Sequence, residues 1–254
     1  MRKFISILAN GALDLFSPPY CLLCGKPTHR RRRALCWECL RAPLLRANDA
    51  LACEICGGRA IAAGRPCPDC ESERPAFYQA RSAAVFAGDI RLLVHMFKYR
   101  RALWLRGDFC DWLHGCFITH YANAVFDCIV PVPVSRVKFF QRSYNQAEFL
   151  AAGLGKLVSL PVFPNALARR GGAATQTTLT RQARLKNAAR AFLVAQPKKV
   201  AGKDVLLVDD VMTSGATANA CARALLRAGA QSVRVITVAR GVLDGGEGVR
   251  LSKS

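Results

Sequence analysis

The chain has 254 residues, a length that suits one or two domains with a buried core. Apolar residues make up 52% and charged residues 21%, an ordinary globular composition that excludes an intrinsically disordered chain. Lys and Arg number 37 against 17 Asp and Glu, so the net charge is +20. A surplus of this size predicts anionic partners or substrates: nucleic acid, phosphorylated metabolites or an anionic membrane surface.

The first 16 residues have a basic start and an apolar body, as a signal peptide does. Asn10 and Asp14 interrupt the apolar body and no small-residue cleavage site follows, so a short amphipathic helix is the preferred interpretation. The longest uncharged stretch, residues 112–126, is shorter than the roughly 20 apolar residues that a membrane span needs. The sequence therefore predicts a cytoplasmic protein without a membrane span.

Cysteine pairs dominate residues 21–70, which hold eight of the twelve cysteines as four Cys-x2-Cys pairs. The first two pairs are offset from the last two by 32 and 31 residues, which indicates an internal duplication. Two such pairs supply four thiolates to one tetrahedral ion, and Gly25 and Gly57 permit the left-handed turn of each knuckle. We predict two structural Zn2+ sites, and the spacing leaves open which pairs share an ion. The predicted ligands are Cys21, Cys24, Cys36, Cys39, Cys53, Cys56, Cys67 and Cys70.

A disulfide framework is the alternative for these cysteines, but it needs an oxidising compartment. The remaining cysteines lie in apolar surroundings and are predicted to be buried thiols; they are Cys110, Cys116, Cys128 and Cys221.

The positive charge is concentrated beyond the cysteine pairs. Each four-thiolate zinc site has a net charge of −2, which offsets most of the basic surplus of residues 1–75. Residues 135–199 carry 12 Lys and Arg against the single acidic residue Glu148, so we place the anion-binding surface there. The run Arg30–Arg33 is interpreted as a solvated loop, with a nucleic-acid contact as the alternative.

The remaining chain shows an alternating α/β pattern. The predicted strands are 81–86, 128–132, 192–194 and 203–208, and the predicted helices are 90–99, 102–120, 145–158 and 218–228. We predict an N-terminal helix and zinc module over residues 1–74, an α/β domain over 75–242 and a disordered tail over 243–254.

A continuous apolar run, Val205–Val208, ends at two adjacent carboxylates, Asp209 and Asp210. Such a run is typical of a parallel strand buried on both faces, and open α/β sheets bind ligands at the carboxyl ends of such strands. A small, hydroxyl-rich turn follows before a helix, where backbone N–H groups can hold a phosphate. Its residues are Thr213, Ser214, Gly215, Ala216 and Thr217.

The turn lacks both the glycine pattern of a dinucleotide fingerprint and the Gly-Lys-Ser/Thr of a P-loop. Two carboxylates beside a turn that can bind one phosphate group suit a sugar phosphate. The carboxylates would accept hydrogen bonds from the ribose hydroxyls. An acidic strand end followed by an ordinary capped helix is the alternative.

This stretch resembles the 5-phosphoribosyl-1-pyrophosphate (PRPP) signature of the type I phosphoribosyltransferases. Together with the duplicated cysteine pairs, it resembles the ComF family of competence-associated proteins, which join a zinc-ribbon module to a phosphoribosyltransferase domain. Further matches are Phe97–Arg100, Val130–Val134 and the Asn-Gln-Ala-Glu sequence of residues 145–148. The resemblance implies the type I phosphoribosyltransferase fold, an α/β fold with a parallel sheet flanked by helices, behind an N-terminal double zinc-ribbon module.

The resemblance also implies site residues. Asp209 and Asp210 would face the ribose hydroxyls, and the turn Thr213–Thr217 would hold the 5-phosphate. Pyrophosphate would bind to the loop of Pro133, Val134, Ser135 and Arg136, with Mg2+ held mainly by PRPP oxygens and waters. Arg181 and Arg184, in a mobile loop over about 169–187, would act with the two aspartates in displacing pyrophosphate from ribose C1.

Three functions are consistent with this resemblance. The first is a PRPP-binding protein of DNA uptake that also binds single-stranded DNA, with DNA-uptake or recombination proteins as partners. The alternatives are an active phosphoribosyltransferase with an unidentified acceptor and a PRPP-sensing module without catalysis. The expected nucleic-acid contacts are Arg142, Tyr144, Asn145, Gln146, Gln176, Arg181, Arg184 and Asn187. We predict that bases of the DNA stack on nearby aromatic residues, with core packing of these residues as the alternative. The aromatic residues are Phe139, Phe140, Tyr144 and Phe163.

Overall fold

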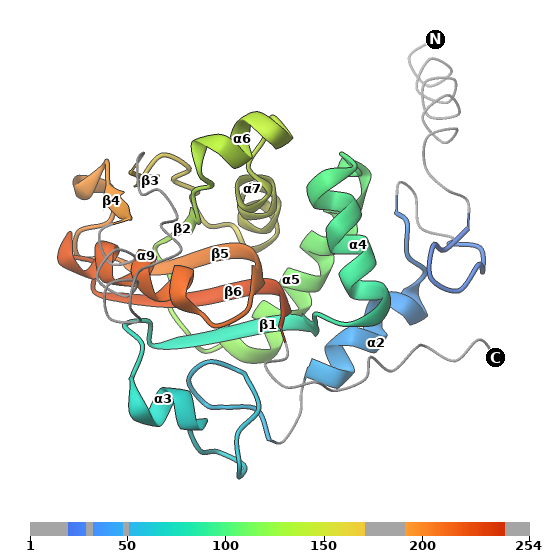
Figure 1. Cartoon of the computed structure of the whole chain (residues 1–254), viewed down its shortest axis with the longest axis horizontal. Helices are drawn as coiled ribbons and strands as arrows, with labels where there is room; N and C mark the ends of the chain where they lie inside the picture. The colour runs from blue at the N-terminus through green and yellow to red at the C-terminus, as the bar shows by residue number, and fades with distance from the viewer. Residues whose placement is uncertain (1–19, 29–32, 48–50, 171–190, 242–254) are drawn as a thin grey trace, which may run out of the picture.

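A four-stranded parallel sheet is the centre of the fold (Figure 1). The computed structural model describes residues 20–28, 33–47, 51–170 and 191–241. The strand order is β1-β6-β5-β2. The strands are β1 (Gln79–Val85), β2 (Cys128–Pro131), β5 (Asp204–Met212) and β6 (Ser232–Arg240). The predicted parallel α/β sheet is therefore confirmed.

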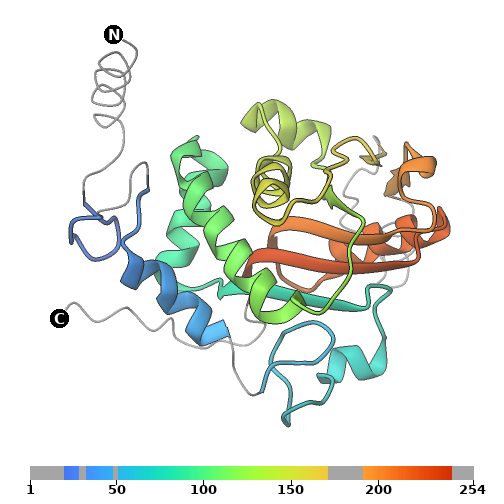
Figure 2. The ribbon, with the colours of Figure 1, turned by 180° about the vertical axis from the view of Figure 1, so that it is seen from behind.

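Helices cover both faces of this sheet and create two hydrophobic cores (Figures 1 and 2). Successive residues of a strand point to opposite faces, so Leu206 and Val208 pack into one core while Val205 and Leu207 pack into the other. The first core is closed by α4 (Gly88–Tyr99), α5 (Arg106–Tyr121) and α7 (Gln146–Val158), and the second by α9 (Ala216–Arg227). All four strand residues are fully buried, which explains the continuous apolar run.

The smaller elements complete the described chain. A two-stranded antiparallel ribbon joins β3 (Leu167–Arg169) to β4 (Phe192–Val194). Two short helices, α2 (Trp37–Ala47) and α3 (Pro68–Ser72), follow the cysteine knuckles, and α6 (Arg136–Arg142) precedes α7. Two 3-10 turns cover Leu103–Leu105 and Pro197–Lys199. No helix in the described ranges is both long and apolar enough to cross a membrane.

Most predicted elements are present with shifted ends. The predicted helix over 218–228 begins earlier, at Ala216, because Gly215 takes a left-handed φ of 77° and turns the chain directly into the helix. Strand β6 and helix α6 were not predicted from the sequence. Strand β6 was missed because Arg234 and Thr237 interrupt its apolar run. Helix α6 was missed because its seven residues show no apolar periodicity. The predicted N-terminal helix and the tail over 243–254 lie outside the described residues.

Candidate functional site

The eight paired cysteines form two tetrads, and each tetrad combines consecutive pairs. Within each one, all four sulfur atoms lie within 4.8 Å of one another. The distance from Cys24 Sγ to Cys36 Sγ is 3.6 Å, and that from Cys56 Sγ to Cys67 Sγ is 3.7 Å. A tetrahedral zinc ion with Zn–S bonds of about 2.3 Å places its sulfurs about 3.8 Å apart. Each tetrad could therefore hold a zinc ion; the members are Cys21, Cys24, Cys36, Cys39 and Cys53, Cys56, Cys67, Cys70.

The two tetrads repeat the same backbone geometry, as the sequence duplication predicts. In each repeat a glycine amide donates to the carbonyl of the first cysteine, at 2.9 Å from Gly25 to Cys21 and from Gly57 to Cys53. Both glycines have positive φ, 72° and 65°, so the predicted left-handed turns are present. This turn aims both sulfurs of the knuckle at one point, where the second cysteine pair supplies the other two ligands.

The tetrads lie on opposite faces of the sheet. The first belongs to the core beneath α5, where Trp112 Nε1 donates to the Leu40 carbonyl at 2.7 Å. The second belongs to the core beneath α9 and lies against the edge of β1, where the Ala80 amide donates to the Ile55 carbonyl at 2.7 Å. Cys24 is exposed, whereas all four cysteines of the second tetrad are buried. The second site is thus the one in which the net charge of a zinc–thiolate cluster would be shielded from water.

The carboxyl end of β5 forms a small pocket of about 40 Å³. Asp209 and the turn that follows β5 line this pocket, and the turn leads directly into the N-terminus of α9. Ser214 Oγ accepts from the Ala216 amide at 3.4 Å, and Gly215 is the residue at the helix start. The described turn residues in the lining are Thr213, Ser214, Gly215, Ala216 and Thr217. A carboxylate, hydroxyl groups and a helix N-terminus thus converge at one place.

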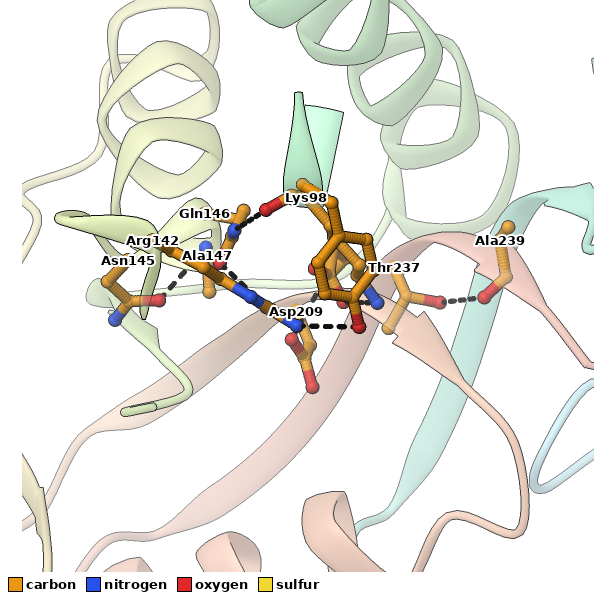
Figure 3. Close-up of polar contacts among 10 residues, drawn as sticks. Lys98, Arg142, Asn145, Gln146, Ala147, Asp209, Thr237 and Ala239 are labelled. Carbon is orange, nitrogen blue, oxygen red and sulfur yellow. Dashed lines mark hydrogen bonds and ion pairs between the residues drawn. The ribbon is translucent and has the colours of Figure 1, made fainter. Parts of the chain in front are cut away.

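Thr237 also lines the pocket, and the sequence interpretation missed it. It lies on β6 directly beside Asp209 in the sheet register, and its side chain is fully buried. Its hydroxyl lies 2.6 Å from Ser82 Oγ. It donates to the Ala239 carbonyl at 3.2 Å (Figure 3). The signal that could have identified it is a hydroxyl residue placed between the apolar residues Ile236 and Val238.

Asp210 has a different environment from Asp209. The structure pairs its carboxylate with Lys98 Nζ of α4 at 2.9 Å, and the two side chains are only 11% and 18% exposed. Asp209 Oδ1 instead accepts from the Asp210 amide at 2.8 Å, and Asp209 is the one that lines the pocket. The two adjacent carboxylates, expected to act together on ribose, thus have unequal surroundings.

The last turn of α4 is held in place by the segment at the start of α7 (Figure 3). Tyr144 donates its hydroxyl to the Phe97 carbonyl, and Gln146 Nε2 donates to the Lys98 carbonyl at 3.4 Å. Arg142 Nη2 donates to the Tyr99 hydroxyl at 2.9 Å, and its guanidinium lies 4.6 Å from the centre of that ring. These contacts bring together two segments that are distant in the sequence and fix the backbone that carries Lys98.

This arrangement bears on the predicted nucleic-acid contacts. Arg142, Tyr144 and Gln146 are buried, and Asn145 accepts from the Ala147 amide at the start of α7. A nucleic acid could reach the buried three only if the α4–α7 contacts opened. The aromatic residues Phe139 and Phe140 of α6 are 46% and 80% exposed. The other expected contacts, Gln176, Arg181, Arg184 and Asn187, lie outside the described residues.

The predicted pyrophosphate loop follows β2. Val132 donates its amide to the Val208 carbonyl at 2.9 Å, so the chain leaves β2 beside the residue that precedes Asp209. Pro133, Val134 and Ser135 are half-buried, and Arg136 begins α6. The predicted catalytic residues Arg181 and Arg184 belong to the part of the chain that the structure does not describe.

The four unpaired cysteines are buried, as predicted. Burial raises the pKa of Cys110 and Cys128 to about 11 and that of Cys116 to about 12. Burial and the nearby Asp209 raise the pKa of Cys221 well above its ordinary value. These thiols are therefore protonated at neutral pH and suit packing rather than nucleophilic chemistry.

The ion pair between Lys98 and Asp210 should make the effects of substitutions at these two residues on the free energy of unfolding non-additive. Lys98→Met should lower the free energy of unfolding by about 3 kcal/mol, because it leaves a largely buried carboxylate without its counter-ion. The double variant Lys98→Met/Asp210→Asn should recover most of this loss. Lys26→Met is the matched control, since its pair with Glu38 is exposed and should contribute less than about 1 kcal/mol. Urea unfolding of these proteins and of the single variant Asp210→Asn, five with the wild type, checks this; additive losses from the two changes at Lys98 and Asp210 would contradict the pairing.

Comparisons with known proteins agree with this architecture. The family model described as phosphoribosyl transferase domain matches residues 140–251, which include β5, the pocket turn and α9. The chain is 29% identical over 230 residues to the DNA utilization protein YhgH of Escherichia coli (strain K12), covering 88% of this chain and 97% of that protein. It is 25% identical over 225 residues to competence protein F of Haemophilus influenzae, covering 87% and 96%. It is 27% identical over 247 residues to competence protein ComFC of Bacillus subtilis (strain 168), covering 94% and 96%.

The parallel sheet, the strand-end pocket and the matched domain define a protein of the phosphoribosyltransferase fold. Two four-cysteine sites of the zinc-ribbon type precede and flank this domain. The chain is a homologue of the YhgH and competence protein F/ComFC proteins, and the ComF resemblance drawn from its sequence is confirmed.

Proposed function

We propose that the chain binds PRPP, or a related 5-phosphorylated ribose, at the carboxyl end of β5 and acts in DNA utilization. The observation that carries this proposal is the shared pocket of Asp209 and the Thr213–Thr217 turn at the start of α9. The 5-phosphate would take the backbone N–H groups and hydroxyls of the turn, while Asp209 would accept from a ribose hydroxyl. Because the tetrads need reduced thiols, we place the protein in the cytoplasm.

The positive charge of the chain favours the same ligand. Arg169 and Arg170 are both exposed and belong to the basic segment 135–199. The chain's net charge of +20 would attract a ligand with several phosphate charges. Mg2+ would supply charge neutralisation to the ligand's phosphates, and Asp209 would hold it, because one carboxylate with several waters is a donor set that this ion accepts.

Calorimetric titration with PRPP and Mg2+ tests this proposal. Thr217→Val should weaken binding by roughly 10- to 100-fold, since a hydrogen bond to a charged group contributes about 1.5–3 kcal/mol. Thr119→Val is the control, because Thr119 is an exposed residue of α5, on the opposite face of the sheet. A wild-type protein that binds neither PRPP nor ribose 5-phosphate would overturn the proposal.

We propose single-stranded DNA as a second ligand. Helix α6 exposes Phe139 and Phe140 at the start of the basic segment 135–199, and exposed aromatic rings beside positive charge form stacking platforms for unpaired bases. The YhgH relatives are named for DNA utilization, and the competence protein F and ComFC relatives are named for competence. These names support DNA as a ligand.

Salt dependence separates the contributions of charge and stacking to this binding. Affinity for an oligonucleotide should fall steeply with salt, with a slope of about −0.7 for each phosphate neutralised. Arg169→Gln/Arg170→Gln should flatten the slope, whereas Phe139→Ala/Phe140→Ala should weaken binding by about 1–3 kcal/mol per base at an unchanged slope. Fluorescence anisotropy across a salt series measures both effects. Salt-independent binding would exclude this basic surface as the site.

A further inference from the structure

The last residue of β6 reaches the second cysteine tetrad. Arg240 Nη2 lies 3.3 Å from Cys56 Sγ, although the two residues are 184 positions apart in the sequence. Two other guanidinium nitrogens of Arg240, Nε and Nη1, are buried without a hydrogen-bond partner among the described residues. Unpaired buried N–H groups of a cation are costly, so this arrangement needs a compensating anionic group.

A zinc-loaded second tetrad is such a group. Four thiolates and one Zn2+ have a net charge of −2, and all four cysteines of this tetrad are buried. The amides of Cys56, Gly58 and Cys67 also donate to its sulfurs, but an amide has no net charge. Arg240 supplies a full positive charge next to the cluster. In the first tetrad, Cys24 is exposed, so water can solvate the charge there.

The backbone of the same residue holds the pocket loop. Arg240 is the sheet partner of Met212, and the next amide, Gly241 N, donates to the Met212 carbonyl at 2.8 Å. The segments after β6 and after β5 pack so closely that a Cβ on Gly241 would lie 3.0 Å from Thr213 Cγ2. Arg240 thus contacts the metal site with its side chain, while its backbone adjoins the first residues of the pocket loop.

We propose that Arg240 is the charge partner that retains zinc in the second tetrad, and that it couples this tetrad to the strand-end pocket. The first part depends only on the cysteine geometry. The coupling rests on the proposed sugar-phosphate function. Because coupling between two sites is reciprocal, a ligand in the pocket should slow zinc loss, and zinc loss should weaken the ligand.

Zinc release from the full-length, zinc-loaded protein tests the first part. A chelator removes the metal, and alkylation of freed cysteines followed by peptide mass mapping reports which tetrad has opened. Arg240→Gln should speed release from the second tetrad by about 10-fold or more, the usual effect of losing a residue that supports metal ligands. Release from the first tetrad should stay unchanged, and Arg240→Lys should restore part of the retention.

Arg223→Gln is the matched control. Arg223 pairs at 3.4 Å with Glu73, three residues from Cys70, and both side chains are exposed. This variant removes the same charge near the same tetrad and should release zinc at the wild-type rate. Equal release from the second tetrad in wild type and Arg240→Gln would overturn the proposal, as would equal acceleration at both tetrads, which indicates general destabilisation.

The coupling is tested by adding saturating ribose 5-phosphate to the same assay. Zinc loss from the second tetrad should slow several-fold in wild type and not in Arg240→Gln. Absence of protection in a wild-type protein that binds the sugar phosphate by calorimetry would overturn the coupling alone. Absence of binding would overturn both the coupling and the proposed function, while the release rates would still decide the role of Arg240.

Discussion

Replacing Asp209 and Asp210 together by asparagine should weaken PRPP binding by at least about 100-fold. Each carboxylate would lose charge-assisted hydrogen bonds of roughly 1.5–3 kcal/mol with the ribose hydroxyls. The structure also predicts that the single variants differ. Asp209 lines the pocket, whereas Asp210 is paired with Lys98 at 2.9 Å, so Asp209→Asn should have the larger effect. Calorimetric titration of the three variants with PRPP and Mg2+ measures both expectations.

Asp204→Asn is the control for this comparison. Asp204 lies at the opposite end of β5, where its carboxylate accepts from the Ser232 hydroxyl, so the variant removes the same charge from the same strand. Its PRPP affinity should match that of the wild type. Wild-type affinity in the double variant would show that the strand-end carboxylates do not contact the ligand.

Loss of zinc should destabilise the whole described fold. The purified protein should carry two zinc ions per chain, and Cys53→Ser/Cys56→Ser should carry one and melt at a much lower temperature. Cys53 and Cys56 belong to the same core as Val205 and Leu207 of β5, so the sheet loses packing when this tetrad opens. Structural zinc sites supply a large part of the folding free energy of small modules. Metal analysis and thermal unfolding by circular dichroism check the two results.

Cys221→Ala is the control for this experiment, because Cys221 is buried in the same core but belongs to neither tetrad. It should retain two zinc ions. Disulfides within the tetrads of freshly purified protein, or an unchanged melting temperature after zinc removal, would contradict the assignment.

Local pattern was sufficient to predict the pocket strand and the cysteine tetrads. The apolar run of β5 and the Cys-x2-Cys spacing each depend on interactions within a few residues, and the duplication reappears as the same hydrogen bond from Gly25 to Cys21 and from Gly57 to Cys53. The position of Asp209 near the carboxyl edge of the sheet, where open α/β sheets bind ligands, follows from the strand assignment and the rule for parallel sheets.

Contacts between distant segments could not be predicted in this way. Arg142 and Gln146 are residue types that often contact nucleic acids, but tertiary packing places them against the last turn of α4. Likewise, nothing near Arg240 in the sequence points to Cys56, because the contact depends on the pairing of β6 with β1 and on the second knuckle lying along β1. Both contacts join segments far apart in the sequence, and no local periodicity encodes such contacts.

A crystal structure of the protein with PRPP and Mg2+ is the most direct test of sugar-phosphate binding at the carboxyl end of β5. We expect the 5-phosphate at the backbone N–H groups of the Thr213–Thr217 turn and the ribose within hydrogen-bonding distance of Asp209. The pyrophosphate should lie beside the loop that follows β2, near Ser135. A ligand bound elsewhere, with the strand-end pocket empty, would contradict the central claim that this pocket is a sugar-phosphate site.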